Sequence, residues 1–270
     1  MRRLRPAQVR DYLELLDVRT PPADPLERLR VLQWAHLAKV PFENLDHFLP
    51  RQTPLRVPAL FRKVVRRHRG GICYELNLLF AALLRSLGHR VRLLSARVCL
   101  GPGRLSKPFD HLALLVDGRW LVDVGFDPSV SAPIEVRAGA TVAHGRGTQR
   151  LVRQAGEWLL RTRDLRGSPS YAYRFSTRRR ALREFLPQRR FHREDPGSPF
   201  ASAWVWGVAT PQGSQLLRGG RLVVEVRGRE TVRAVRSVAH AARLLAAMGK
   251  RGPPSLRRLR RPPGAAPSRH

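Results

Sequence analysis

The chain has 270 residues, 43% of them hydrophobic, so it can bury one large core or two to three small ones. Its formal net charge at pH 7 is +31, yet only four of the 51 basic residues are lysines, and the 47 arginines occur in every segment. This spread favours an arginine-rich solvated surface. The alternative is attraction of anionic ligands, from a phosphate-bearing cofactor up to nucleic acid.

The sequence also argues against a disulfide-stabilised or membrane-spanning protein. No apolar run approaches the length of a membrane span, and the N-terminus lacks a signal-peptide pattern. Two cysteines in a chain of this length give no disulfide framework, which agrees with a reducing compartment. We therefore expect a cytoplasmic protein without a membrane partner.

Helical patterns dominate residues 1–88, which we predict to form a helical domain. The clearest helix follows Cys73, because apolar residues then recur with the helical period as far as Gly88, a typical C-terminal cap. The other predicted helices cover residues 7–17, 25–38 and 59–67.

Residues 89–190 are instead rich in short apolar runs separated by turn residues, and we predict an antiparallel sheet closed as a barrel or packed as a sandwich. Asp117-Gly118 is a strong hairpin signal between strands at 111–116 and 120–124. Further strands are predicted at 91–100, 149–152, 157–162 and 171–176.

The last part of the chain combines short strands with one helix. Residues 177–199 are charged and predicted to be irregular, 202–227 hold two or three strands, and 237–248 fit a helix. Residues 191–250 are therefore predicted to form an α/β lid. The basic, proline-rich residues 251–270 are predicted to be a disordered tail.

Cys73 is the strongest candidate for a catalytic residue. Residues 69–76 read Arg-Gly-Gly-Ile-Cys-Tyr-Glu-Leu, and the glycine pair permits a tight turn just before the predicted helix. The unpaired N–H groups and the positive dipole end of a helix N-terminus favour a thiolate, which is a nucleophile. The alternative is a buried structural cysteine. Cys99 alternates with apolar strand residues and is expected to be inert.

His111 and Asp123 are the predicted partners of Cys73. Among nine histidines His111 begins a buried-looking strand, and Asp123 lies in an apolar run on the next strand of the hairpin. A buried carboxylate needs a partner, and it would fix the tautomer and direction of the ring. A two-residue loop would pair Asp123 with Leu112 and point His111 to the other face, whereas a three-residue loop or a bulge pairs it with Ala113. The site therefore predicts an odd-length loop or a bulge, with a structural His–Asp pair as the alternative.

Three motifs together resemble the arylamine N-acetyltransferase family. Residues 69–75 are similar to its nucleophile motif, residues 40–45 (Val-Pro-Phe-Glu-Asn-Leu) to its N-terminal signature, and His111 with residues 121–126 (Leu-Val-Asp-Val-Gly-Phe) to its remaining triad elements. The order of these segments is also similar, and the resemblance covers about residues 7–249.

The resemblance implies an α+β fold with an N-terminal helical bundle, a central antiparallel β-barrel and a C-terminal α/β lid around a papain-like Cys-His-Asp catalytic core. It further implies a ping-pong reaction in which Cys73 takes an acetyl group from acetyl-CoA and passes it to an aromatic amine or hydrazine. His111 would then manage the protons and Asp123 would orient the ring. The chain has no paired Cys/His spacing, so no metal is expected.

Further positions match residues of the family. Phe42 and Phe126 match positions that line the acceptor pocket, although an ordinary core aromatic is the alternative for Phe42. Glu43 and Arg69 match a structural ion pair near the nucleophile.

The short loop at 101–108 offers Ser106 and Lys107 as candidates for contacts with the phosphates of coenzyme A, with plain solvated charge as the alternative for Lys107. Asp127 stands where the family usually has glycine, and its carboxylate would repel those phosphates or narrow the pocket.

Three other functions use part of the same evidence. An amide-forming acyltransferase with a larger acyl thioester donor keeps the triad. A cysteine hydrolase of the papain or transglutaminase type is disfavoured by the Pro-Phe-Glu-Asn-Leu signature. A nucleic-acid-binding protein on a degenerate enzyme fold would use the net charge, but an intact triad argues against it. The physiological acceptor, the acyl-donor preference, the oligomeric state and the role of the tail stay open.

Overall fold

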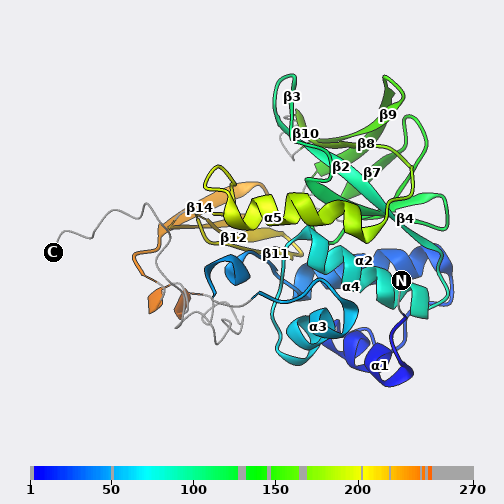
Figure 1. The fold of residues 1–270 in the computed structure, drawn as a ribbon, viewed down its shortest axis with the longest axis horizontal. Helices are drawn as coiled ribbons and strands as arrows, with labels where there is room; N and C mark the ends of the chain where they lie inside the picture. Colours follow the sequence, from blue (N-terminus) through cyan, green and yellow to red (C-terminus); the bar gives the residue numbers. More distant parts are fainter. Residues whose placement is uncertain are drawn as a thin grey trace.

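The computed structural model describes residues 3–49, 52–126, 132–144, 147–163, 169–201, 203–218, 220–237, 239–240 and 243–244. Helices come first along the chain, a large antiparallel sheet follows, and a smaller antiparallel sheet comes last (Figure 1). The arrangement is α+β, as predicted from the sequence.

The N-terminal part is built around one fully enclosed helix, α4 (Cys73–Ser86), whose residues from Cys73 to Leu84 are all buried. A helix that presents almost no face to solvent is stable only inside a core. The predicted third helix is more complex than expected, because it starts as α3 and continues as a π-helical turn. The remaining bounds are α1 (Pro6–Leu15), α2 (Pro25–Lys39), α3 (Val57–Phe61) and the π-helical turn (Arg62–Arg66).

The large sheet is antiparallel and nearly closed into a barrel. Its strand order is β6-β5-β4-β2-β10-β9-β8-β7, with β3 paired to the end of β2. The chain after β6 returns to the other end of the sheet, where Gly139 donates its backbone N–H to the Leu151 carbonyl of β8. The bounds are β2 (Val91–Gly101), β3 (Arg104–Leu105), β4 (His111–Val116), β5 (Trp120–Val122), β6 (Ile134–Glu135), β7 (Thr141–His144), β8 (Gly147–Gln154), β9 (Glu157–Arg163) and β10 (Pro169–Phe175).

The β4–β5 hairpin has the odd-length loop that the sequence argument required. Val116 pairs with Trp120, so the loop comprises residues 117–119, and the register continues with Leu114 opposite Val122. The next position, Asp123, therefore lies opposite Ala113, on the face that His111 shares.

Asp117 holds this loop in place. Its backbone adopts φ of +54°, and its carboxylate accepts hydrogen bonds from the His89 ring (2.8 Å) and the Arg90 backbone N–H (2.8 Å). The loop is thereby fixed to the chain that leaves α4.

The smaller sheet takes a strand from the N-terminal part of the chain. Its order is β1-β11-β12-β13-β14, and β1 (Phe42–Glu43) pairs with β11. The signature Val-Pro-Phe-Glu-Asn-Leu therefore joins this sheet to the helices, and α2 packs against β11. The described part of the predicted α/β lid is mainly sheet, and much of its predicted helix at 237–248 lies outside the described residues. The other bounds are η1 (Leu45–Phe48), β11 (Val205–Thr210), β12 (Gly213–Arg218), β13 (Arg221–Val226) and β14 (Arg229–Ala234).

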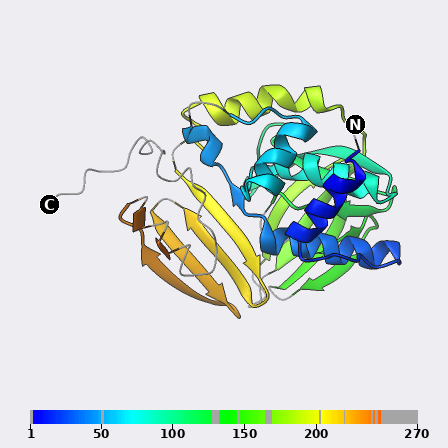
Figure 2. The ribbon, with the colours of Figure 1, turned by 90° about the horizontal axis from the view of Figure 1, so that it is seen from below.

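The prediction that residues 177–199 are irregular was wrong. They contain a 3-10 turn, η3 (Leu182–Phe185), followed by helix α5 (Leu186–Glu194), which runs along one side of the molecule (Figure 2). The helix has few aliphatic residues, and it packs by burying Gln188 and His192. An apolar periodicity search misses such a helix, and a domain boundary at residue 190 would fall inside it.

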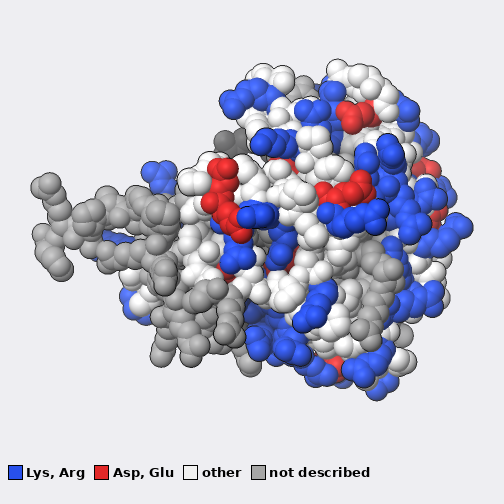
Figure 3. Space-filling view, in the orientation of Figure 1, with Lys and Arg blue, Asp and Glu red and all other residues white. Residues whose placement is uncertain are grey.

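Basic side chains are spread over the helices and the barrel alike on the face drawn in Figure 3, with few acidic ones between them. Among the described segments, no helix is both long and apolar enough to cross a membrane.

Candidate active site

Cys73 is the first residue of α4, and it is buried, with 4% of its surface exposed. The glycine pair before it serves close approach rather than an unusual turn, since neither glycine has a positive φ. A Cβ on Gly70 would lie 1.8 Å from the Pro41 carbonyl oxygen, and one on Gly71 would lie 2.6 Å from Glu75 Oε2. Gly70 therefore lets the chain before α4 approach Pro41 and β1, and Gly71 leaves room for the Glu75 side chain.

His111 and Asp123 meet beside Cys73. His111 Nε2 donates to Asp123 Oδ2 over 2.6 Å, and the Cys73 side chain is close enough to the ring to raise its pKa. Burial of the ring lowers its pKa, but the Asp123 carboxylate and Cys73 raise it more, to about 10. At neutral pH the raised pKa favours a protonated, cationic ring beside the Asp123 carboxylate.

Asp123 is completely buried, and every direction around its carboxylate is occupied by a donor. Oδ1 accepts from Asn77 Nδ2 (2.8 Å) and from the Gly125 backbone N–H (2.9 Å), while Oδ2 also accepts from the Tyr173 hydroxyl (3.0 Å). These donors hold an ionised carboxylate in one orientation, which in turn fixes the plane of the His111 ring.

Asn77 and Tyr173 are site residues that the sequence argument missed. Asn77 also donates to the Leu112 carbonyl (2.7 Å) and accepts from the Val124 N–H (3.0 Å), so it joins α4 to both strands of the hairpin. Its signal was present, because it is a polar residue one helical turn after Cys73 in an otherwise apolar helix. Tyr173 lies on β10 and had no sequence signal, since it reaches Asp123 only because β10 pairs with β2 and β2 with β4 in the curved sheet.

The structure brings both predicted acceptor-pocket aromatics close to these groups. The Phe126 ring centroid lies 5.0 Å from that of His111 and 5.1 Å from that of Tyr173. Phe42 bridges to Gly71 next to the start of α4, and its ring lies 6.0 Å from Phe200. The Phe126 ring thus packs directly against His111, while the backbone of Phe42 joins the chain that leads into α4.

The two predicted coenzyme A contacts have other partners in the structure. Ser106 is buried, and its hydroxyl accepts from the Val98 backbone N–H over 2.7 Å. Lys107 is exposed, with its ammonium 5.2 Å from the centroid of the Phe191 ring. Asp127 lies outside the described residues.

Helix α5 supports the residue that precedes His111. Asp110 accepts from Gln188 Nε2 (2.8 Å), and His192 Nε2 lies 3.0 Å from the same oxygen. Burial raises the pKa of Asp110, but His192 lowers it more, so this carboxyl stays ionised at neutral pH. The Asp110 carbonyl also accepts from the Tyr74 hydroxyl (3.0 Å) on α4. The segment before the catalytic candidate is thus fixed from two helices.

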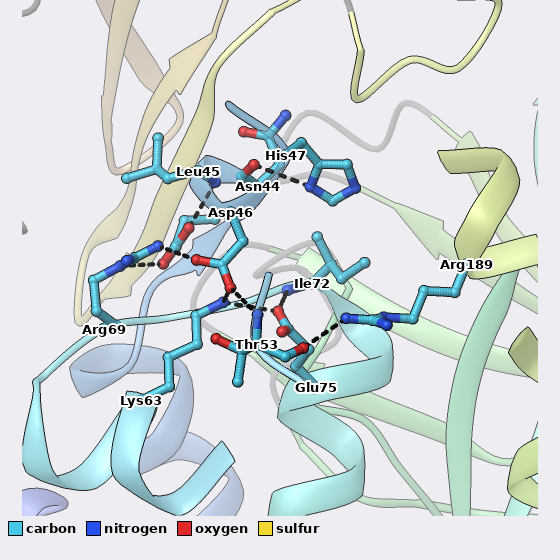
Figure 4. Close-up of polar contacts among 11 residues, drawn as sticks. Asn44, Leu45, Asp46, His47, Thr53, Lys63, Arg69, Ile72, Glu75 and Arg189 are labelled. Atoms are coloured by element: carbon cyan, nitrogen blue, oxygen red, sulfur yellow. Dashed lines mark hydrogen bonds and ion pairs between the residues drawn. The ribbon is translucent and has the colours of Figure 1, made fainter. Parts of the chain in front are cut away.

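Five charged side chains, none of them more than 10% exposed, form a buried ion cluster under the start of α4 (Figure 4). It contains the expected Glu43–Arg69 pair, with Arg69 Nε donating to Glu43 Oε1 over 2.7 Å. The other members, Asp46, Lys63 and Glu75, were not anticipated from the sequence.

Two further observations limit the chemistry of the described part of the chain. Burial raises the pKa of the Cys99 thiol, which disfavours its thiolate. The described residues hold no group of three or more His, Cys, Asp or Glu side chains arranged as a metal site.

Known proteins share this sequence and fold. The N-acetyltransferase family profile matches residues 25–249. An arylamine N-acetyltransferase of Mycolicibacterium smegmatis is 32% identical over 226 residues, covering 80% of this chain and 82% of that protein. The arylamine N-acetyltransferase / N-hydroxyarylamine O-acetyltransferase of Salmonella typhimurium is 40% identical over 142 residues, which is 51% of this chain and only 50% of that protein.

Solved structures match over most of the chain. The arylamine N-acetyltransferase of M. tuberculosis gives a TM-score of 0.83 at 29% identity, covering 93% of this chain and 96% of that one. The Mycobacterium marinum arylamine N-acetyltransferase in complex with CoA gives 0.79 at 28% identity, covering 89% and 91% of the two chains. The chain therefore belongs to the arylamine N-acetyltransferase family.

Proposed function

We propose that this protein transfers an acetyl group from acetyl-CoA to an arylamine or arylhydrazine through an acetyl-cysteine on Cys73. The observation that supports this most strongly is the placement of Cys73 at the N-terminus of α4, beside a His111 ring that Asp123 holds and whose pKa Cys73 helps to raise. Membership of the arylamine N-acetyltransferase family selects the acceptor class, and the relative solved with CoA supports the donor.

In the first half-reaction the Cys73 thiolate attacks the carbonyl carbon of the thioester. A bond forms between Sγ and the acetyl carbon, the bond to the sulfur of coenzyme A breaks, and the leaving thiolate takes the proton of His111. One thioester replaces another, so the step is nearly balanced in free energy. The N–H groups at the start of α4 favour the anionic reactant.

In the second half-reaction the amine nitrogen attacks the acetyl-cysteine. A C–N bond forms, the C–Sγ bond breaks, and the neutral His111 takes the proton that the amine loses. This restores the thiolate–imidazolium pair. The donors around Asp123 keep the ring in one orientation through both halves.

Phe42 and Phe126 are the proposed walls of the acceptor pocket, because Phe42 joins the chain that leads into α4 and the Phe126 ring packs against His111. Ser106 and Lys107 remain the residues proposed to serve coenzyme A: Lys107 by direct contact with its phosphates, and Ser106 by shaping the loop, because its buried hydroxyl accepts the Val98 N–H. The cytoplasm is the proposed location, in keeping with two free cysteines.

Mass spectrometry after mixing the protein with acetyl-CoA, without an acceptor, tests the proposal. One acetyl group should appear on Cys73, and addition of an arylamine should remove it. The Cys73→Ala protein should stay unmodified, whereas Cys99→Ala is the matched control and should acetylate normally. Unmodified wild-type protein would refute the acetyl-donor assignment.

Replacing acetyl-CoA by other acyl thioesters distinguishes this function from the alternative functions. A larger acyl thioester that loads Cys73 faster than acetyl-CoA would indicate an amide-forming acyltransferase instead. Nucleic-acid binding with a steep salt dependence and no acylation of Cys73 would indicate a degenerate enzyme fold.

A further inference from the structure

Lys63 is an unusual residue in this chain. Only four of the 51 basic residues are lysines, and this one is 4% exposed in the π-helical turn between α3 and α4. A lysine ammonium is a compact charge with three donors, whereas the arginine used elsewhere presents a wide planar fork. Its selection here indicates a site that requires a small cation.

The ammonium of Lys63 lies between two carboxylates. Nζ is 3.0 Å from Asp46 Oδ2 and 3.0 Å from Glu75 Oε2 (Figure 4). Glu75 Oε2 also accepts the backbone N–H of Ile72 over 3.2 Å, and Ile72 immediately precedes Cys73. Lys63 thus contacts the carboxylate that caps the helix carrying the proposed nucleophile.

The charge of the cluster makes this contact necessary. Three carboxylates face two cations, and Arg69 is used by Glu43 (2.7 Å) and Asp46 (2.8 Å). The groups that act on Glu75 are Lys63 from the π-helical turn, Asp46 from η1 and Glu43 from β1. Burial raises the pKa of Glu75 and the other carboxylates add to this, while Lys63 lowers it. Glu75 Oε1 has no hydrogen-bond partner, so Lys63 is its main compensation.

We propose that Lys63 is a positioning residue for acyl transfer. Lys63 holds Glu75 next to Asp46 and the Ile72 N–H, which fixes the first turn of α4 and therefore the position of Cys73 relative to His111. The inference rests on the proposed role of Cys73. Without Lys63, Glu75 is tolerated at this place only when it carries a proton, and its ionised form pushes the first turn of α4 away from its position.

The test is the rate of Cys73 alkylation by iodoacetamide between pH 6 and pH 9, in the full chain. In Lys63→Met the alkylation rate relative to wild type should fall by about tenfold as the pH rises across this range, because the uncompensated Glu75 carboxyl loses its proton with rising pH. In Lys63→Met/Glu75→Gln the pH-dependent loss should disappear, because glutamine still accepts the Ile72 N–H without a charge. Lys39→Met is the matched control, since Lys39 pairs with Asp17 at the surface, and its ratio to wild type should stay near one.

If the alkylation rate of Lys63→Met stays a constant fraction of the wild-type rate across this pH range, the proposal is overturned. A pH-dependent loss of alkylation rate that persists in the double variant would overturn it as well. If Lys63→Met does not fold, Glu75→Gln and the double variant are compared with each other. They should alkylate at equal rates from pH 6 to pH 9, and a growing difference would equally overturn the proposal. Alkylation does not involve acetyl-CoA, so a failure of acetylation alone would refute the proposed function and leave this result intact.

Discussion

Gly125 offers a direct test of the packing between the β4–β5 hairpin and helix α4. A Cβ at this position would lie 2.6 Å from Cys73 Cα, 2.8 Å from Asn77 Nδ2 and 3.1 Å from Cys73 Cβ. Ordinary contact begins near 3.4 Å, so an alanine needs about 0.8 Å more room (3.4 minus 2.6). Cys73 Cα belongs to the backbone of α4, so no side-chain rotation relieves the contact. Gly125 has no positive φ, and the effect of an alanine is therefore purely steric.

The shift of α4 away from Gly125 must separate Cys73 from His111. The reason is that Gly125 lies two residues after Asp123, and the Gly125 backbone N–H donates to the Asp123 carboxylate. A misplacement of about 1 Å in a catalytic group reduces the rate by about 100-fold. Overpacking of a dense core costs about 1–3 kcal/mol. With an unfolding entropy of about 2.1 cal/mol/K per residue, this lowers the Tm of a 270-residue chain by about 2–5 °C. Gly125→Ala should therefore fold, with its loss of activity far larger than its loss of stability.

The assay is single-turnover acetylation of Cys73 at saturating acetyl-CoA, together with thermal unfolding. Gly197→Ala is the matched control, because its Cβ would meet only Asp195 Oδ1, at 3.1 Å, on an exposed side chain that can rotate. This control should change the acetylation rate less than twofold. A Gly125→Ala protein with the wild-type acetylation rate would show that the helix and hairpin are not in rigid contact, and would refute the reasoning.

Three further predictions concern the same site. The pKa of His111 is raised from 6.5 to about 10. The stability that the protein gains from the charged His111–Asp123 pair is therefore fully present below pH 6.5 and lost as the pH rises through about 10. Over that pH range the Tm of the wild-type protein should fall more than the Tm of His111→Gln. Asn77→Ala leaves two buried backbone groups of the hairpin unpaired and should lower the free energy of unfolding by about 2–3 kcal/mol in urea denaturation, with equal stability contradicting this. Asp117→Ala removes the acceptor of the His89 ring at a residue with positive φ and should reduce stability by about 2 kcal/mol, whereas Asp117→Asn, which tolerates that φ, should lose less.

Local sequence predicted the parts of the site that depend on neighbouring residues. The start of α4 at Cys73 follows from the apolar period after a glycine pair, and the three-residue loop before Trp120 follows from requiring His111 and Asp123 on one face. Both arguments start from the spacing of residues along the chain. The regular geometry of helices and strands converts this spacing into positions in space.

Helix α5 and the buried ion cluster were beyond such reasoning. In α5 the buried residues are polar, and they are tolerated there because Asp110, far away in the sequence, supplies their partner. Lys63 and Glu75 each look like ordinary surface charges on their own helices. Their burial depends on the close approach of the chain before α4 to Pro41 and β1, which Gly70 permits, and on the room that Gly71 leaves for the Glu75 side chain.

Local patterns along the chain identified three groups of the candidate site: a cysteine at a helix start, and a histidine and an aspartate on one face of a hairpin. The groups that hold these three in place depend on long-range packing. Tyr173 reaches Asp123 because β10 lies beside β2 in the sheet, next to the hairpin, and Lys63 reaches Glu75 because β1, the π-helical turn and α4 converge. A pattern of neighbours fixes secondary structure, but the partner of a buried polar group is chosen by long-range packing, which no local pattern records.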